Sequence, residues 1–105
     1  MNTSDAVARL SALAQETRLA VVRALVKAGP DGMAAGDIAE RVSASPTALS
    51  FHLKELQAGG LLRSRRRGRF VIYTADIEGL STLVDFLLND CCQGRPEICG
   101  LATPR

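Results

Sequence analysis

The segment from Pro46 to Ala58 has both a clear start signal and a clear stop signal for a helix. Ser45 is a favoured N-cap residue and Pro46 suits the first helical position, while Gly59-Gly60 allows a left-handed C-cap. At about 100° per residue, three leucines fall on one side and five other residues fall on the opposite side. The leucines are Leu49, Leu53 and Leu56, and the opposite side holds Thr47, Ser50, Phe51, Lys54 and Glu55. The sequence therefore predicts a helix anchored by leucines whose other face is exposed.

Two amphipathic helices are expected before this segment. The first is capped by Ser4-Asp5, and the second ends at the Gly29-Pro30 stop signal. Their predicted buried stripes are Val7, Leu10, Leu13 and Ala14 in the first helix, and Leu19, Val22, Leu25 and Val26 in the second.

A short helix, two strands and a last helix are expected in the rest of the chain. A short helix is expected over residues 34–42, strands over 61–65 and 70–75 with the turn at Gly68, and a last helix over 77–90. The order predicts a mainly α fold with a small β-hairpin, the winged helix-turn-helix, in which the hairpin is the wing.

The chain of 105 residues is short enough to be a single domain. We expect residues 1–90 to form the DNA-binding and dimerisation domain and residues 91–105 to form a tail. The first and last helices supply apolar stripes for a homodimer interface, and the alternative is that they close the core of one chain. No apolar run approaches the roughly 20 residues of a membrane span, and the N-terminus shows no secretory signal. These features predict a cytoplasmic protein without a membrane partner.

Charge is distributed unevenly along the chain. The formal net charge is only +2, but residues 41–69 hold seven basic groups and one acidic group. The segments before and after them are mildly acidic. A local excess of cations attracts a polyanion, so this middle segment predicts binding to double-stranded DNA.

The predicted DNA contacts lie on the helix over 46–58 and on the wing. The N-terminal residues of a recognition helix reach base edges, and wing arginines suit phosphates or a narrow minor groove. The candidate residues are Thr47, Ala48, Ser50 and Phe51 for bases, His52 and Lys54 nearer the backbone, and Arg65, Arg66, Arg67 and Arg69 on the wing.

Two residues of that helix allow more than one interpretation. Phe51 either touches a thymine methyl or packs under a neighbouring helix. His52 is the only histidine in the chain. It is expected to bond a phosphate or a group of its own helix, because serving as a metal ligand would remove it from the recognition helix.

All three cysteines of the chain, Cys91, Cys92 and Cys99, lie within nine residues of the tail. Zinc normally takes four ligands, whereas trivalent arsenic or antimony bonds three thiolates in a pyramid. Gly94 and Pro96 supply the bend that lets three sulfurs converge, and Arg95 favours the thiolate form. The alternatives are a redox switch that pairs Cys91 or Cys92 with Cys99, and cysteines without a role.

An enzyme of the thiol-reductase kind is a further alternative. It requires a base near the nucleophile, and no histidine or phosphate-binding glycine loop stands near the cysteines in the sequence. The sequence therefore favours a protein that is not an enzyme and needs no organic cofactor.

Three stretches of the sequence resemble the ArsR/SmtB family of metal-responsive bacterial repressors. They are "ETRLAVVRALV", "SASPTALSFHL" and "LKELQAGGLLRSRRRGRFVIYT", within a likeness that covers residues 7–90. The resemblance implies a homodimer that joins through its first and last helices, binds an imperfect palindrome and leaves it on binding metal. It also implies an arsenic(III) inducer, because some members carry an adjacent cysteine pair and a third cysteine just after the last helix.

This chain departs from the family at its other metal sites. The short helix over 34–42 has no cysteine, and the final helix has no histidine, which removes the zinc arrangement across the dimer. That departure leaves the tail thiols as the predicted inducer site.

Overall fold

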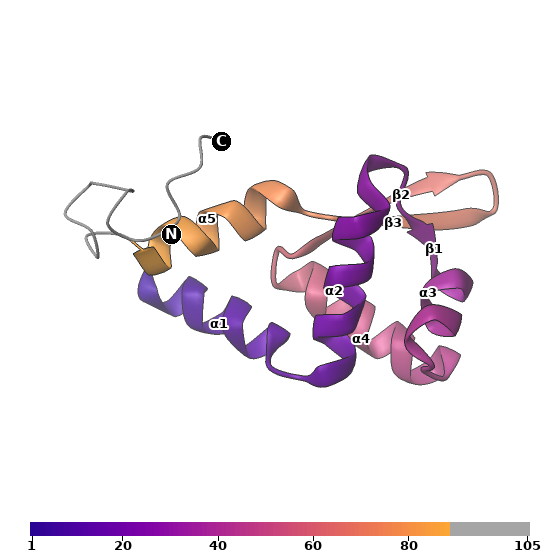
Figure 1. The fold of residues 1–105 in the computed structure, drawn as a ribbon, viewed down its shortest axis with the longest axis horizontal. Coiled ribbons are helices and arrows are strands. Elements are labelled where there is room, and N and C mark those ends of the chain that lie inside the picture. The colour runs from indigo at the N-terminus through magenta and orange to yellow at the C-terminus, as the bar shows by residue number, and fades with distance from the viewer. Residues whose placement is uncertain (89–105) are drawn as a thin grey trace.

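The computed structural model describes residues 1–88, which form five helices and a small sheet (Figure 1). The helices are α1 (Thr3–Leu13), α2 (Glu16–Ala28), α3 (Ala35–Val42), α4 (Pro46–Ala58) and α5 (Ile77–Leu88). The strands are β1 (Met33–Ala34), β2 (Leu62–Arg67) and β3 (Phe70–Ala75), and a short 3-10 helix spans Gly29–Asp31. This architecture confirms the winged helix-turn-helix prediction. The predicted tail, with its boundary at residue 90, lies outside the described residues.

Side-chain caps fix where the helices begin. Ser45 Oγ accepts a hydrogen bond from the Ala48 N–H at 3.2 Å, with Pro46 in the first turn, which confirms the predicted start of α4. The predicted cap of α1 was wrong, because Asn2 Oδ1 accepts from the Asp5 N–H at 2.8 Å and the helix begins at Thr3. Asparagine is as good a cap as serine, so the helix gains residues at its N-terminal end.

The sheet has three antiparallel strands in the order β1-β3-β2, one more than the predicted hairpin. Met33 pairs with Tyr73 and Ala34 pairs with Ile72, which adds β1 to the outer edge of β3. Gly32 permits this approach, since its φ is +66° and a side chain there would collide with the Tyr73 carbonyl oxygen.

The wing hairpin is longer than the sequence pattern indicated. β2 continues to Arg67, which pairs with Phe70 across the turn at Gly68, where φ is +63°. The predicted end at Arg65 was wrong because ladder pairing stabilises extended backbone even in a run of arginines. The turn at Gly68 is confirmed.

The core lies where α2, α3 and α4 meet the start of the wing. Leu49, Leu53 and Leu56 are buried, which confirms the predicted anchoring face of α4. They pack with Leu25 and Ile38, both of which are fully buried. Each such aliphatic side chain contributes about 1.5–3 kcal/mol on burial, so this cluster fixes the orientation of α4.

The apolar faces of α1 and α2 differ from the predicted ones. In α2 the buried residues are Val21, Val22, Ala24 and Leu25, while Leu19 and Val26 are exposed. In α1 the buried residues are Ala6 and Ala12, while Val7 and Leu10 are exposed. The burial of Val22 and Leu25 in α2 is confirmed, whereas the predicted burial of Leu19 and Val26 was wrong. Helix α1 packs through the smaller side chains of Ala6 and Ala12 and leaves Val7 and Leu10 outside.

Helices α1 and α5 lie side by side at one end of the molecule, away from α3 and the wing (Figure 1). An Arg9 Nη donates to the Gly79 carbonyl at 2.9 Å, and Gly79 allows the close approach of the Gly60 carbonyl oxygen. On α5, Leu83 is buried, but Ile77, Val84 and Leu87 are exposed. The terminal helices therefore close the core of one chain only in part. Over residues 1–88, no helix has the length and hydropathy to cross a membrane.

Candidate nucleic-acid interface

The outward face of α4 carries the side chains that the sequence assigned to DNA. Thr47, Ala48, Ser50, Phe51 and Lys54 are exposed. Since the buried leucines fix the rotation of the helix, these five side chains are presented together. Their contact with DNA stays a prediction.

Phe51 is 55 % exposed, so it is not packed beneath a neighbouring helix within the part of the chain described. One cation lies against it instead, because Arg18 Cζ stands over the ring at 5.4 Å from the centroid. Arginine and aromatic rings attract each other through the quadrupole of the ring. The structure therefore leaves the ring available to a partner while restraining it from one side.

His52 makes a hydrogen bond that the sequence did not predict. Arg18 Nε donates to His52 Nδ1 at 3.0 Å, joining the first turn of α2 to α4 across 34 residues of chain. The expected partner was a phosphate or a group of the same helix; the bond seen comes instead from α2, which crosses close enough for Arg18 to reach the imidazole. The phosphate contact stays a prediction. Arg18 lies in the stretch "ETRLAVVRALV" that carries the family resemblance, but its contact with α4 depends on the packing of the two helices.

The exposed arginines of the wing fall on two faces of β2. Alternation along a strand places Arg63, Arg65 and Arg67 on one face and Ser64 and Arg66 on the other. Gln57 Nε2 on α4 donates to Ser64 Oγ at 2.9 Å, so the face of Ser64 and Arg66 is the one beside α4. Arg66 therefore adds a wing cation beside the exposed face of α4, which itself carries Lys54.

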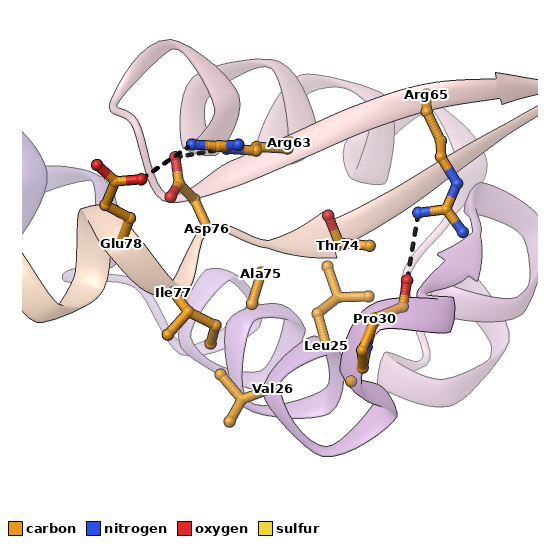
Figure 2. A pocket seen from close by; sticks show the side chains of 11 residues that line it. Leu25, Val26, Pro30, Arg63, Arg65, Thr74, Ala75, Asp76, Ile77 and Glu78 are labelled. Carbon is orange, nitrogen blue, oxygen red and sulfur yellow. Dashed lines mark hydrogen bonds and ion pairs between the residues drawn. The ribbon is translucent and has the colours of Figure 1, made fainter. Parts of the chain in front are cut away.

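The side chain of Arg65 reaches from the wing to the turn that follows α2 (Figure 2). Its two terminal nitrogens donate to the carbonyl oxygens of Pro30 and Asp31, each at 3.2 Å. These carbonyls belong to the turn that follows α2, where the helix leaves backbone acceptors without intrahelical donors. Arg65 therefore ties the wing to α2, whereas Arg66, Arg67 and Arg69 are exposed without such a bond among residues 1–88.

The base of the wing is joined to α5 by charged groups around a shallow cleft (Figure 2). Arg63 Nε lies 3.3 Å from Asp76 Oδ2, and one of its terminal nitrogens lies 3.6 Å from Glu78 Oε2. Asp76 Oδ1 also accepts from the Gly79 N–H at 2.9 Å, so one carboxylate both caps α5 and holds β2. Leu25, Val26 and Ile77 line the apolar side of the cleft.

The predicted inducer site falls elsewhere in the chain. Cys91, Cys92 and Cys99 lie outside the described residues. Within residues 1–88, no three side chains of histidine, cysteine, aspartate or glutamate are grouped so that they can hold a metal ion.

Together, the fold, the exposed face of α4 and the cationic wing define a DNA-binding protein of the winged helix-turn-helix class. Comparison with known proteins gives the same result. Residues 13–65 match the family described as "Helix-turn-helix domain". The chain is 30 % identical over 92 residues to the transcriptional activator HlyU of Vibrio cholerae, covering 88 % of this chain and 82 % of HlyU. A solved structure described as reduced HlyU is 31 % identical, with 88 % of this chain and 94 % of that chain covered and a TM-score of 0.66. A second HlyU structure has a TM-score of 0.67.

Other similar solved structures carry related descriptions. An ArsR-like transcriptional regulator from Rhodococcus sp. RHA1 is 26 % identical, with 93 % of this chain and 90 % of that chain covered and a TM-score of 0.75. A homodimeric winged helix-turn-helix DNA-binding domain from Mycobacterium bovis, a possible ArsR-family regulator, is 25 % identical, with 86 % and 83 % covered and a TM-score of 0.66. A possible transcriptional regulator for arsenical resistance is 28 % identical, with 91 % and 97 % covered and a TM-score of 0.68.

These similarities identify the family. The chain belongs to the helix-turn-helix domain family of transcription regulators, and it is similar in sequence and fold to ArsR-like winged helix-turn-helix regulators.

Proposed function

We propose that the protein is a homodimeric repressor that occupies operator DNA and leaves it on binding trivalent arsenic or antimony. The observation that carries the DNA-binding part is the single surface formed by the exposed face of α4 and Arg66 beside it. In this proposal Thr47, Ala48, Ser50 and Phe51 read base edges in the major groove. Lys54 and the wing residues Arg66, Arg67 and Arg69 neutralise phosphates.

The terminal helices support the dimer. Val7 and Leu10 on α1 and Ile77, Val84 and Leu87 on α5 are large apolar side chains that one chain leaves in water. A second copy placed against them buries both sets at once in a two-fold interface. A dimer also brings two copies of α4 to two half-sites, which a reader this small needs for adequate specificity.

The inducer part rests on the tail sequence. Three thiols are the donor set that trivalent arsenic takes, and Cys91, Cys92 and Cys99 supply that number in each chain. The similar structure described as a possible regulator for arsenical resistance supports the same inducer. Binding just after α5 changes the dimer geometry in this proposal, and a coupling of about 1–3 kcal/mol is typical between two such sites.

The experiment is a titration of the reduced dimer on fluorescent promoter DNA with arsenite or antimonite. We expect stoichiometric arsenite to release the DNA, and we expect Cys91→Ser, Cys92→Ser and Cys99→Ser each to weaken that release. Release that persists in all three variants contradicts the thiol site.

A redox-sensing repressor is the second candidate, because the same thiols can form a disulfide and the relative HlyU has been studied in a reduced form. The same titration separates the two mechanisms. Release by diamide, reversed by dithiothreitol, together with no response to arsenite, favours the redox function.

A further inference from the structure

Arg18 stands outside the recognition helix but contacts two consecutive residues on it. It lies in the first turn of α2, where Gln15 Oε1 accepts its backbone N–H at 2.8 Å. Its side chain is half-buried and crosses to α4, where it meets Phe51 and His52. The N-terminal cap of α2 therefore fixes the position from which Arg18 reaches α4.

The hydrogen bond to His52 determines which imidazole nitrogen carries the proton. A guanidinium is always a donor, so Nδ1 of His52 accepts with its lone pair. In a neutral imidazole the proton then resides on Nε2. Arg18 thus leaves His52 with one defined N–H donor, at the far side of the ring from the bond.

The same guanidinium restrains the neighbouring ring. Arg18 Cζ lies 5.4 Å from the Phe51 centroid, and the Phe51 and His52 rings are 6.1 Å apart with a 58° angle between their planes. Phe51 has little other support, since 55 % of it is exposed. One cation therefore orders two adjacent side chains that would otherwise sample several rotamers.

We propose that Arg18 is a specificity-determining positioning residue, which presents the Phe51 ring to a thymine methyl and the His52 Nε2–H to a phosphate. This inference rests on the proposed contact between α4 and DNA. It adds that part of the base preference is set from α2, by a residue that reads no base itself. Aromatic contact with the thymine methyl and N–H donation to phosphate are both established forms of protein–DNA contact.

The test uses the full-length reduced protein with Arg18→Gln and Arg18→Ala. Glutamine keeps an amide donor but has no cation for the Phe51 ring, and alanine removes both contacts. Arg23→Ala is the matched control, because Arg23 is an exposed arginine on the same helix. Thermal melts select the variants that remain folded. If Arg18→Ala does not fold, Arg18→Gln replaces it in the base-preference measurement, with the same expected and overturning results, because glutamine has no cation for the Phe51 ring.

The first readout needs no DNA. NMR of the imidazole nitrogens is unambiguous here because His52 is the only histidine. We expect the Nε2–H tautomer in the wild-type protein and in Arg23→Ala, and a mixture of tautomers in Arg18→Ala. An unchanged tautomer in folded Arg18→Ala overturns the role of Arg18 at His52.

The second readout is base preference, measured by selecting bound sequences from a random DNA pool. We expect Arg18→Ala to lose preference at the same base pairs as Phe51→Ala, with specific binding about tenfold weaker. We also expect the double variant to be no worse than Phe51→Ala alone. Unchanged preference in Arg18→Ala, or additive losses in the double variant, overturns the proposal for Phe51. Absence of any preference in the wild-type protein contradicts the DNA-binding proposal itself, whereas the tautomer measurement still decides the contact with His52.

Discussion

Helix α4 and helix α5 are both amphipathic, yet they place their apolar residues in opposite ways. α4 turns Leu49, Leu53 and Leu56 into the core and exposes a mainly polar face with Lys54, on which Phe51 is the one large apolar side chain. α5 buries Leu83 but leaves Ile77, Val84 and Leu87 exposed. The difference indicates two kinds of partner, since the exposed face of α4 suits a polyanion and that of α5 suits another apolar surface.

The largest expected effect lies in the core beneath α4. Leu56→Ala removes a fully buried side chain and leaves a cavity, so we expect the free energy of unfolding to fall by about 3 kcal/mol. Urea denaturation followed by circular dichroism measures it. Leu19→Ala is the control, since Leu19 is 48 % exposed, and an equal loss in both variants contradicts the assignment of the core.

The next effect concerns the exposed face of α5. Leu87→Lys places a charge where the proposed dimer buries an apolar side chain that is 52 % exposed in one chain, so we expect the dimer to weaken by about 2 kcal/mol or more. Sedimentation equilibrium measures the dissociation constant. Leu19→Lys places the same charge on α2 and is the control. Equal dissociation constants for the two variants contradict a dimer interface on α5.

The wing supplies a smaller effect. Arg66→Ala removes a cation beside α4, so we expect DNA affinity to fall by about 1 kcal/mol and the salt slope to decrease by about one unit. Arg67→Ala is also expected to reduce the salt slope, because Arg67 is exposed next to the turn of the wing. Arg65→Ala is the control on the same strand. We expect it to change the salt slope less, because the Arg65 guanidinium is bonded to the carbonyls of Pro30 and Asp31. If Arg65→Ala changes the salt slope more than Arg66→Ala does, then the face of β2 that carries Arg65, and not the face that carries Arg66, contacts DNA.

The smallest effect is expected at the junction between the wing and α5. Arg63→Ala breaks ion pairs in which the arginine side chain is 65 % exposed, so we expect a loss of at most about 1 kcal/mol in the free energy of unfolding. Urea denaturation again measures it. A loss above about 2 kcal/mol indicates that Arg63 couples α5 to the wing more strongly than an exposed ion pair can.

Local signals in the sequence predicted the elements whose ends are set by caps and turns. Ser45, Pro46 and Gly68 predicted the start of α4 and the turn of the wing because their chemistry acts within a few residues. β1 was missed, since two residues carry no periodicity and the strand exists only through its pairing with β3. The buried face of α2 was predicted in part: Val22 and Leu25 are buried, but the choice between Val21 and Leu19 depends on how the neighbouring helices pack.

The candidate site also contains residues that local patterns predict and contacts that they do not predict. Helical periodicity was sufficient to place Thr47, Ser50 and Lys54 on the exposed face of α4. The bonds from Arg18 to His52 and from Arg65 to Pro30 and Asp31 join residues 34 and 35 positions apart, which no local pattern encodes.

The central claim is that a dimer, joined through the terminal helices, places two copies of α4 on DNA. Analytical ultracentrifugation of the reduced protein with labelled promoter DNA tests it most directly. We expect a complex of two protomers per specific site, which is lost on substituting Leu87→Lys. Specific binding by a single protomer, or a two-protomer complex that is unchanged by that substitution, would contradict it.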